Sequence, residues 1–372
     1  MAASESNVVV VGAGVIGCAV AVELARGGAQ VTLVDRALPG GAASGASAGM
    51  LGVGVEAHGP GPMLELLRWS RELYPAFVVE LENVTGLTVG HRRNGILQVA
   101  LDDAELEALE LQAGWQALAG RVARLSSESV AKLEPQLAPV VGAAWHLDDQ
   151  LVDPRRLVAA LVRRAQMLGV RFMTGEVEGL RSSSDWSVDG VDVDGQPLLG
   201  QVVVCGGSWS SSLLGVPEVV FPVRGQMLAF EPQPNVTPDA KRPPLIGRPV
   251  FGAGGYLVPR GDVILCGSTD ERVGFDSGVT DDGLAALEVR ARALCPALGR
   301  VVTRTSWAGL RPGSLDGLPF IGRVRPGLWA ATGHYRNGIV LAPATAALLG
   351  SLLLGGTPGR DPAPFSFARL GI

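Results

Sequence analysis

Glycine spacing near the start of the chain suggests the first chemistry. Gly12, Gly14 and Gly17 form the pattern GxGxxG between an apolar run, 8–11, and an apolar helical stretch, and Asp35 follows the next strand-like segment. In this pattern the glycines permit a tight turn and let the backbone approach a pyrophosphate, while the acidic residue accepts hydrogen bonds from a ribose. The spacing therefore predicts a dinucleotide-binding turn. The motif alone does not choose between NAD(P) and FAD, but its position and a second strand entering a glycine turn at 202–207 favour FAD.

Three further side chains have the chemistry to hold a carboxylate. Arg311 lies in GLRPG, Arg336 in GHYRNG and Tyr256 in GGYLVPR. A guanidinium can hold a carboxylate through two parallel hydrogen bonds, and a phenol can donate another. The residues alone leave the alternatives open, because arginines mostly lie at the surface and strand tyrosines often pack between sheets.

Acid–base and metal chemistry find little support in the residues. The chain has four histidines, and neither His334 nor His58 has a serine or cysteine partner nearby in the sequence that would suggest a catalytic triad. No group of histidine, cysteine and aspartate has metal-ligand spacing. We therefore assign no catalytic acid or base and expect no metal.

The bulk composition excludes some partners. The chain has 372 residues, a formal net charge of −5 and 47% hydrophobic residues, so it can bury a sizeable core but offers no basic face for nucleic acid. The four cysteines, Cys18, Cys205, Cys266 and Cys295, include no CxxC pair and stand among apolar residues and glycines. We expect buried free thiols in a reducing compartment, and hence a cytoplasmic protein.

Two apolar stretches imitate membrane segments. The first, 8–25, has no basic leader and contains the glycine pattern, so it predicts a strand, a turn and a helix. The second, 338–356, is about long enough to cross a bilayer, but Pro343, Thr345 and Ser351 interrupt it and no basic cluster follows it. We interpret the second stretch as a buried helix and expect no membrane partner.

Two patterns of secondary structure alternate along the chain. Strand–helix–strand signals occur near both ends and in the middle, and hairpin signals fill the intervals. Asp153 before Pro154 predicts the start of a helix, and Gly261-Asp262 predicts a hairpin turn. In chain order we expect a strand at 8–11, a helix at 15–26, a strand at 30–34, a small-residue loop at 40–52, a strand at 95–101, a helix from 154, a buried strand after 200, hairpins over 221–270, a helix at 281–294, a turn-rich loop at 307–322, and a last strand that leads into the helix from 338.

This alternation predicts an α/β (α+β) fold with two domains. Residues 1–85, 145–220 and 308–372 are expected to form a discontinuous Rossmann domain that binds the nucleotide. Residues 86–144 and 221–307 are expected to form a mostly antiparallel substrate-binding domain that is inserted into the first.

The order of several segments resembles the D-amino-acid-oxidase-type family of FAD-dependent oxidoreductases, and within it the glycine oxidases. The resemblance covers nearly the whole chain and rests on VVVVGAGVIGCAVAVELARGGAQVTLVD, GASAGMLG, DPRRLVAAL, GYLVPR, WAGLRPGSLDGLPFIG and GHYRNGIVLAPATA, in that order. The first segment is generic, whereas the last two are specific to glycine oxidases and their nearest relatives. The resemblance implies a GR-like FAD-binding domain, a noncovalently held FAD and an antiparallel domain over the flavin.

The same resemblance implies a set of site residues. The substrate would lie against Tyr256, Arg311 and Arg336, and Met50 and Gly52 would line its pocket. The helix after Asn337 would point its free N–H groups at the pyrimidine edge of the flavin. Together with the glycine turn, the residues expected to bind the cofactor are Gly12, Gly14, Val15, Ile16, Gly17, Asp35, Arg36, Ala43, Ser44, Ala48, Gly49, Met50, Val177, His334, Tyr335, Arg336, Asn337, Gly338, Ile339 and Val340.

The chain departs from the family pattern in places. Asp35 stands where the family usually has glutamate, which shortens the reach to the ribose but keeps the chemistry. Asp270 stands where glycine oxidases have an apolar methionine, so it would disfavour large apolar substrate side chains, attract an amine, or point to solvent. Relatives with a covalent flavin use a cysteine near the last glycine-rich loops, and none follows Cys295, which favours a dissociable FAD.

The activity that the resemblance implies is the oxidative deamination of glycine and other small amines or amino acids, such as sarcosine and small D-amino acids. The α-hydrogen would leave as a hydride to flavin N5, and water and oxygen would complete the reaction to the 2-oxo acid, ammonia and hydrogen peroxide. The product could feed thiazole synthesis for thiamine. We expect a small amino-acid substrate, oxygen and a homo-oligomeric state.

Two alternatives stay open. An FAD-dependent D-amino-acid dehydrogenase that passes electrons to a quinone or carrier would have the same fold, and the residues do not decide oxygen reactivity. The other is a flavin- or nucleotide-binding protein without catalysis, and two arginines and a tyrosine around one loop system argue against it.

Overall fold

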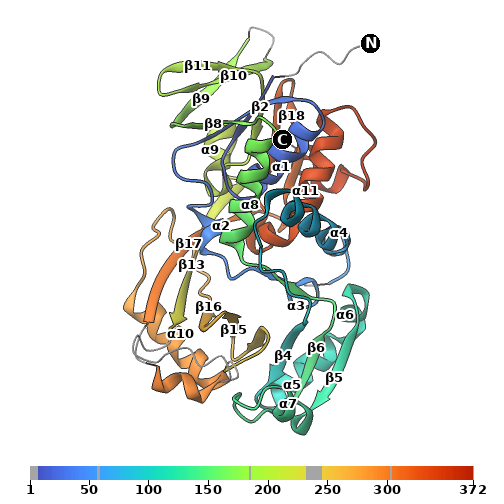
Figure 1. Cartoon of the computed structure of the whole chain (residues 1–372), viewed down its shortest axis with the longest axis vertical. Coiled ribbons are helices and arrows are strands. Elements are labelled where there is room, and N and C mark those ends of the chain that lie inside the picture. Colours follow the sequence, from blue (N-terminus) through green and yellow to red (C-terminus); the bar gives the residue numbers. More distant parts are fainter. Residues whose placement is uncertain (1–6, 57–58, 184–185, 232–244, 302–303, 372) are drawn as a thin grey trace.

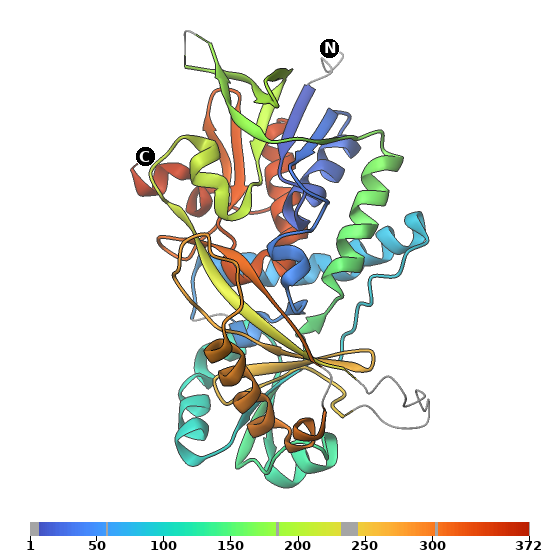
Figure 2. The same ribbon diagram turned by 90° about the vertical axis from the view of Figure 1, so that its left-hand side faces the viewer.

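Two bodies, each built around one large β-sheet, lie end to end in the computed structural model (Figure 1, Figure 2). The structure describes residues 7–56, 59–183, 186–231, 245–301 and 304–371. Early, middle and late parts of the chain meet in the upper body of Figure 1. The sheet of the upper body is therefore assembled from segments that lie far apart in the sequence, and the division of the chain into domains stays a prediction.

The upper body contains a six-stranded sheet in the order β18-β19-β12-β1-β2-β8. Its strands pair in parallel except for β18 and β19, which pair antiparallel. The valine run of β1 is buried on both faces, as a central parallel strand requires. The strands are β1 (Asn7–Val11), β2 (Gln30–Asp35), β8 (Arg171–Thr174), β12 (Gln201–Val204), β18 (Phe320–Arg325) and β19 (Leu328–Thr332).

Four long helices pack in this body: α1 (Val15–Arg26), α4 (Pro62–Thr85), α8 (Pro154–Met167) and α11 (Gly338–Leu353). Helix α1 has the bounds expected from the sequence, and the carboxylate of Asp153 accepts the N–H groups of Arg155 and Arg156 at the start of α8, as expected for a cap. All four cysteines are buried and free, which confirms the prediction for the thiols.

The lower body contains an eight-stranded sheet in the order β17-β13-β16-β15-β14-β4-β6-β5, antiparallel except for the β14–β4 pair. Four helices, α5 (Asp103–Leu111), α6 (Ala113–Ala119), α7 (Ser127–Leu133) and α10 (Asp281–Leu294), belong to the segments of this body. The strands are β4 (Ile96–Ala100), β5 (Val122–Ser126), β6 (Gly142–His146), β13 (Val220–Phe230), β14 (Val250–Gly252), β15 (Gly255–Arg260), β16 (Val263–Gly267) and β17 (Arg304–Ser314).

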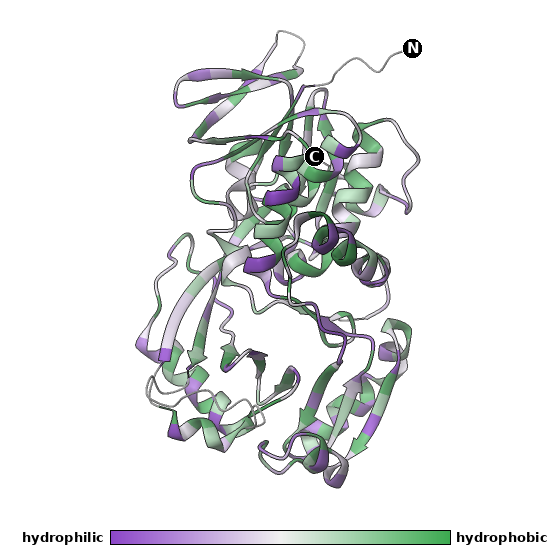
Figure 3. Ribbon diagram, viewed as in Figure 1, coloured by the Kyte–Doolittle hydropathy of each residue, from purple (hydrophilic) through white to green (hydrophobic). Residues whose placement is uncertain are grey.

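Hydrophobic residues predominate along the central strands of the two large sheets (Figure 3). Smaller elements connect and cover the two bodies. A three-stranded antiparallel sheet lies on the upper body, and a two-stranded sheet joins residues near the boundary of the bodies. These elements are β9 (Val177–Ser182), β10 (Val188–Val193), β11 (Gln196–Leu199), β3 (Met50–Leu51), β7 (Gln150–Leu151), α2 (Ala43–Ala46), α3 (Val53–Glu56), α9 (Ser210–Leu214), and the 3-10 turns η1 (Gly207–Trp209), η2 (Pro296–Arg300), η3 (Tyr335–Asn337), η4 (Ala363–Phe365) and η5 (Phe367–Leu370).

The expected turn-rich loop at 307–322 is wrong at both of its ends, since 307–314 belong to β17 and 320–322 begin β18. Strand β17 pairs with β13 along its whole length and places Pro312 opposite Pro222. Because β17 is the edge of the sheet, a proline there removes no hydrogen bond from a second neighbour. The glycines of this segment leave room for close neighbours, since a Cβ on Gly309 would lie 2.6 Å from the side chain of Ala46.

Three strands cross the limits expected between the domains. Strand β6 spans the limit at 144/145, β13 spans the limit at 220/221 and β17 spans the limit at 307/308, and all three belong to the eight-stranded sheet. Sheet membership therefore favours limits at the C-terminal ends of β6 and β17 and at the N-terminal end of β13, and the domain limits themselves stay a prediction.

Helix α11 is the apolar stretch that resembles a membrane span. Within the described residues, one helical segment, Tyr335–Leu353, is long and apolar enough to cross a bilayer, and more than half of it is buried in the molecule. Residues of α11 pack against α1 and α4 in the core of the upper body. The interpretation of this stretch as a buried helix is confirmed.

Helix α11 contains a proline, and two side chains of α4 compensate for it. Pro343 has no N–H, so the carbonyl of Ile339, one turn earlier, lacks its helical donor. The hydroxyl of Tyr74 donates to that carbonyl at 2.7 Å, and the hydroxyl of Ser70 donates to the next one, of Val340, at 2.5 Å. Both hydroxyls are fully buried, so α4 completes the hydrogen bonding of α11.

Replacing Tyr74 with phenylalanine should lower the free energy of unfolding by about 1–3 kcal/mol, because a buried carbonyl would be left without a donor. The double variant Tyr74→Phe/Pro343→Ala should recover much of that loss, since alanine at 343 restores the missing N–H. Urea unfolding followed by circular dichroism measures both values. A double variant no more stable than Tyr74→Phe would show that the orphaned carbonyl is not the cause.

Candidate functional site

A cavity of about 1210 Å³ runs from the glycine turn after β1 to strands β13 and β17. It is larger than the roughly 300–1,000 Å³ usual for small-ligand sites, which suits an extended dinucleotide with a small substrate beside it. Every residue expected to bind the cofactor lines this cavity, except Gly17 and Val340. All four residues expected to contact the substrate line it as well: Met50, Tyr256, Arg311 and Arg336.

The two residues outside the cavity have packing roles. A Cβ on Gly17 would collide with the carbonyl oxygen of Gly12, so Gly17 lets α1 approach the turn closely. Gly12 itself has a φ of +106°, and a Cβ there would meet the carbonyl of Cys205 on the neighbouring strand connection. The carbonyl of Val340 accepts from Ser70, on the side of α11 that faces α4.

The N-terminus of α1 is arranged as an anion site. Its N-cap residue, Gly14, has no side chain, so no side chain of the cap covers the first N–H groups. The hydroxyl of Ser44 accepts the N–H of Val15 at 3.0 Å. The carboxylate of Asp35 accepts the N–H of Ala13 at 2.6 Å, which ties β2 to the glycine turn. These residues fit the pyrophosphate and ribose of a dinucleotide.

Aromatic side chains close the far end of the cavity. The guanidinium of Arg36 lies 4.2 Å from the ring centroid of Trp209, and it also pairs with Glu176 at 3.6 Å. Trp209 contacts Phe275 of the lower body, with 5.4 Å between the ring centroids. Arg36, Glu176, Trp209 and Phe275 all line the cavity, so residues of both bodies enclose it here.

Burial disfavours the charged form of His334. Its imidazole is fully buried, and burial lowers its pKa to about 3. Its Nε2 lies 3.0 Å from the hydroxyl of Thr345, so the neutral ring packs against α11. His58 lies outside the described residues. Within the described part of the chain, no three histidine, cysteine or acidic residues are grouped as metal ligands.

Arg311 projects from β17 across β13 into the cavity. It donates to the hydroxyl of Ser268 at 2.6 Å and to the carbonyl of Thr269 at 3.1 Å. It passes over Gly225, where any Cβ would collide with the guanidinium. Among the residues that the structure describes, no carboxylate forms an ion pair with Arg311, so its charge is available to a ligand.

Arg336 has a different environment. Its Nε and Nη2 donate to the two carboxylate oxygens of Glu56 at 2.7 and 3.1 Å. Burial alone would lower the pKa of Arg336, but the charge and hydrogen bonds of Glu56 raise it above its usual value. Glu56 lines the cavity too, so the protein supplies one carboxylate to this arginine.

Tyr256 lies close to both arginines. Burial raises the pKa of its phenol, and the positive charges of Arg336 and Arg311 act in the opposite direction. Its hydroxyl donates to the sulfur of Met227 at 3.4 Å. Met50 packs in the same buried cluster, so the structure brings all the expected substrate residues together.

Asp270 hydrogen-bonds to Tyr335, a residue expected to contact the cofactor. The hydroxyl of Tyr335 donates to the Asp270 carboxylate, and the pKa of Tyr335 rises to about 12 through burial and then through this partner. Asp270 also lines a second cavity, of about 510 Å³, that shares Tyr256 and Arg336 with the first. It therefore lies at the border of the site, and its effect on a substrate stays a prediction.

Sequence reasoning missed three residues that shape the site: Glu56, Ser268 and Trp209. Each meets its partner across a long stretch of chain, as Glu56 does with Arg336, 280 positions away. For Glu56 the sequence does hold a signal. A lone acidic residue in an apolar segment, as in GVGVEA, needs a cationic partner when it is buried.

The chain matches known proteins over nearly its whole length. The family described as DAO, FAD dependent oxidoreductase, matches residues 7–352. The glycine oxidase of Geobacillus kaustophilus is 34% identical over 98% of this chain and 97% of its own. The bifunctional protein ThiO/ThiG of Synechocystis is 38% identical over 94% of this chain, which spans about half (52%) of that relative's length.

The solved structures agree with the sequence comparison. The crystal structure of glycine oxidase from Geobacillus kaustophilus superposes with a TM-score of 0.90 at 33% identity, over 98% of this chain and 99% of the other. The expected fold class and the expected FAD cofactor are thereby confirmed. The Rossmann sheet, the glycine turn and the matched residues together place this chain in the DAO family of FAD-dependent oxidoreductases, to which it belongs.

Proposed function

We propose that the protein oxidises glycine and other small amines or amino acids, such as sarcosine and small D-amino acids, with oxygen as the electron acceptor. The observation that carries the proposal is Arg311, a cavity-lining cation that no carboxylate of the described chain neutralises. A bound α-amino acid would bring the missing carboxylate. The likeness to proteins named glycine oxidase supports the same substrate class.

The residues of the site would bind and orient the substrate. Arg311 would hold the carboxylate, and Tyr256, which lies close to both arginines, would turn its one O–H donor from the Met227 sulfur to the carboxylate. FAD, when bound, would supply the acceptor for the α-hydrogen as a hydride. His334 would take no proton, because burial disfavours the charged form of its ring. An amine that arrives neutral has already lost its ammonium proton, so the reaction needs no protein base.

Several finer points belong to the same proposal. The FAD would be held noncovalently, since no cysteine follows Cys295 in the chain. The likeness to a protein named ThiO/ThiG supports a role in thiazole synthesis for thiamine. We also propose a homo-oligomeric, cytoplasmic enzyme without nucleic-acid or membrane partners. The acidic charge supports the lack of nucleic acid, the free thiols support a reducing compartment, and the burial of α11 supports the lack of a membrane.

Anaerobic mixing of the FAD-loaded protein with glycine should bleach the flavin absorbance, and admission of air should restore it with formation of hydrogen peroxide. A flavin that stays oxidised would remove glycine from the substrates. Bleaching followed by reoxidation only with a quinone would favour the alternative, a D-amino-acid dehydrogenase.

Replacing Arg311 with methionine should raise the KM for glycine by about a hundredfold or more, because two charge-assisted hydrogen bonds to the carboxylate are lost. Steady-state peroxide formation measures the change. Arg323→Met is the matched control, since Arg323 is an exposed arginine of β18 outside both cavities. Equal KM values in the two variants would contradict the role of Arg311.

Replacing Glu56 with glutamine should tighten carboxylate binding several-fold, because Arg336 would lose its counter-charge while keeping a hydrogen-bond acceptor. The Kd for glycolate, which has the carboxylate but no amine, can be read from the flavin absorbance. Glu65→Gln, at an exposed position of α4, serves as control. Weaker glycolate binding would mean that Glu56 holds Arg336 in place instead of competing with the substrate.

A further inference from the structure

One segment of the lower body, residues 268–280, reaches both halves of the large cavity. It leaves β16 beside Arg311 and ends at the start of α10. Its first residues, Ser268 and Thr269, contact Arg311, and its middle residues, Phe275 and Ser277, line the cofactor half of the cavity. The conformation of this segment therefore bears on both the substrate side and the cofactor side of the cavity.

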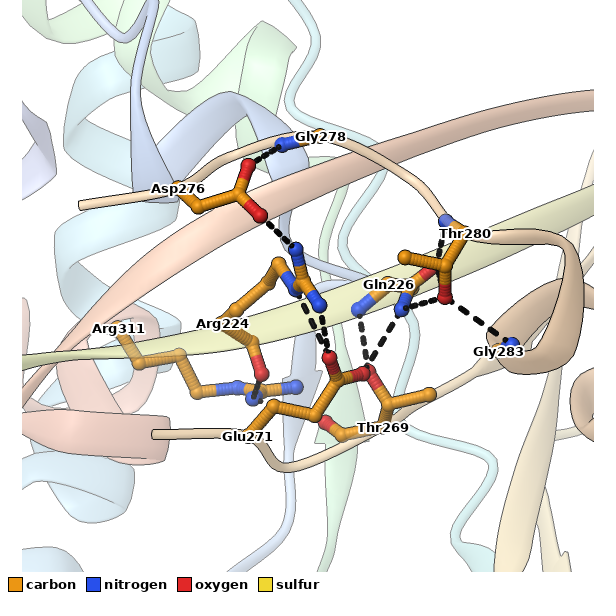
Figure 4. A network of polar contacts seen from close by, with 9 residues as sticks. All are labelled: Arg224, Gln226, Thr269, Glu271, Asp276, Gly278, Thr280, Gly283 and Arg311. Atoms are coloured by element: carbon orange, nitrogen blue, oxygen red, sulfur yellow. Dashed lines mark hydrogen bonds and ion pairs between the residues drawn. The ribbon is translucent and has the colours of Figure 1, made fainter. Parts of the chain in front are cut away.

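Arg224 of β13 fixes the middle of this segment. Its side chain is only 6% exposed and donates to two carboxylates, of Glu271 through Nε at 2.9 Å and Nη2, and of Asp276 through Nη1 at 2.5 Å (Figure 4). The backbones of Arg224 and Glu271 also exchange two hydrogen bonds, at 2.8 and 3.0 Å. A buried guanidinium that bridges two acidic residues holds them at a fixed separation.

Gln226, two residues further along β13, ties the ends of the segment to the same strand. Its backbone N–H donates to the hydroxyl of Thr269 at 2.9 Å. Its side-chain Nε2 donates to the carboxylate of Glu271 at 2.8 Å and to the hydroxyl of Thr280 at 3.0 Å (Figure 4). Burial acts to raise the pKa of Glu271, but hydrogen bonds from Thr269, Arg224 and Gln226 outweigh it and lower that pKa. Glu271 is thus an anion with fixed partners.

On the substrate side, this arrangement aims Arg311. The guanidinium of Arg311 is held by Ser268, by the carbonyl of Thr269 and, at 3.5 Å, by the carbonyl of Arg224 itself. Two of these acceptors belong to the segment that Arg224 and Gln226 fix in place. None of the three is charged, so they orient the guanidinium without neutralising it.

On the cofactor side, the same segment presents Phe275 to the upper body. The ring of Phe275 packs at a tilt against Trp209, which also contacts the guanidinium of Arg36. Asp276, the next residue, is bound to Arg224 and also accepts the N–H of Gly278 at 2.8 Å. Arg224 lines neither cavity, so its side chain acts only through the residues that it holds.

We propose that Arg224 is a positioning residue that couples the two halves of the site. Through Glu271 it fixes the residues that orient Arg311, and through Asp276 it fixes the aromatic wall of the cofactor cavity. The substrate half of this inference rests on the proposed function, in which Arg311 binds a carboxylate. The cofactor half rests on the FAD site alone.

The test compares three variants of the full chain, using FAD-loaded protein for the Kd of glycolate and the kinetics, and protein freed of FAD for the Kd of FAD. Arg224→Met should raise both the Kd for glycolate and the Kd for FAD by about tenfold, the size of one lost charge-assisted contact, while kcat for glycine changes less than KM. Glu271→Gln should raise the glycolate Kd and leave the FAD Kd near the wild-type value. Asp276→Asn should raise the FAD Kd and leave the glycolate Kd near the wild-type value, because Asp276 adjoins Phe275.

Two further variants separate positioning from a general loss of structure. Arg369→Met removes an arginine of similar burial whose two bonds to Asp316 lie outside both cavities, and it should change neither Kd. Arg224→Lys keeps the charge but not the planar fork, and it should give values between those of the wild type and Arg224→Met.

The proposal is overturned if Arg224→Met leaves both Kd values unchanged, or if Glu271→Gln and Asp276→Asn shift the two ligands alike. Its failure is distinguishable from failure of the proposed function. If wild-type protein binds glycolate but does not oxidise glycine, the function falls while the Kd comparison still decides the coupling. If glycolate itself does not perturb the flavin of the wild type, the substrate half of the coupling falls as well.

Discussion

The guanidinium of Arg311 is hydrogen-bonded to uncharged acceptors that leave its positive charge unneutralised, and much of the site depends on this. A partly buried guanidinium is stable when its N–H groups have acceptors, and here a hydroxyl and backbone carbonyls supply them. Strand β17 must run straight past β13 to deliver the side chain, and residue 225 must be glycine to let it through. The resulting cavity attracts an anion at one end, beside the part that fits a dinucleotide.

Arg336 shows the contrast within the same cavity. Its charge is met by the two oxygens of Glu56, from a segment that lies far away in sequence. Burying an ion pair of this kind costs desolvation of both charges, and removing one partner alone leaves the other charge uncompensated. The two arginines that looked equivalent in the sequence therefore differ in what they offer a ligand, and the difference arises from a single acidic residue.

Local parts of the fold were predictable from the sequence, because their causes are local. The bounds of α1, the cap at Asp153 and the hairpin turn between β15 and β16 depend on residues within a few positions of each other. Strand β17 was mistaken for a loop, since its glycines and prolines are typical of turns and its partner β13 lies more than seventy residues away. The partners of Arg311 and Arg336 were missed for the same reason.

Family resemblance located the candidate site better than residue chemistry alone. GxGxxG with its flanking strand and helix indicated a dinucleotide, but nothing in GLRPG by itself distinguishes Arg311 from an arginine at the surface. The distinction depends on Ser268, Thr269 and Gly225, which surround the guanidinium only after β13, β16 and β17 have come together.

The proline in α11 has a consequence for the order in which the molecule is made. Its helix obtains two hydrogen-bond donors from α4, and β19, just before it, adds to a sheet whose other strands come from the first and middle parts of the chain. While the chain is being synthesised, α4 emerges long before its partner, with Ser70 and Tyr74 still without their acceptors. The upper body can close only once α11 has been made, so the glycine turn at the start of the chain gains its complete cavity only after more than three hundred further residues have been added.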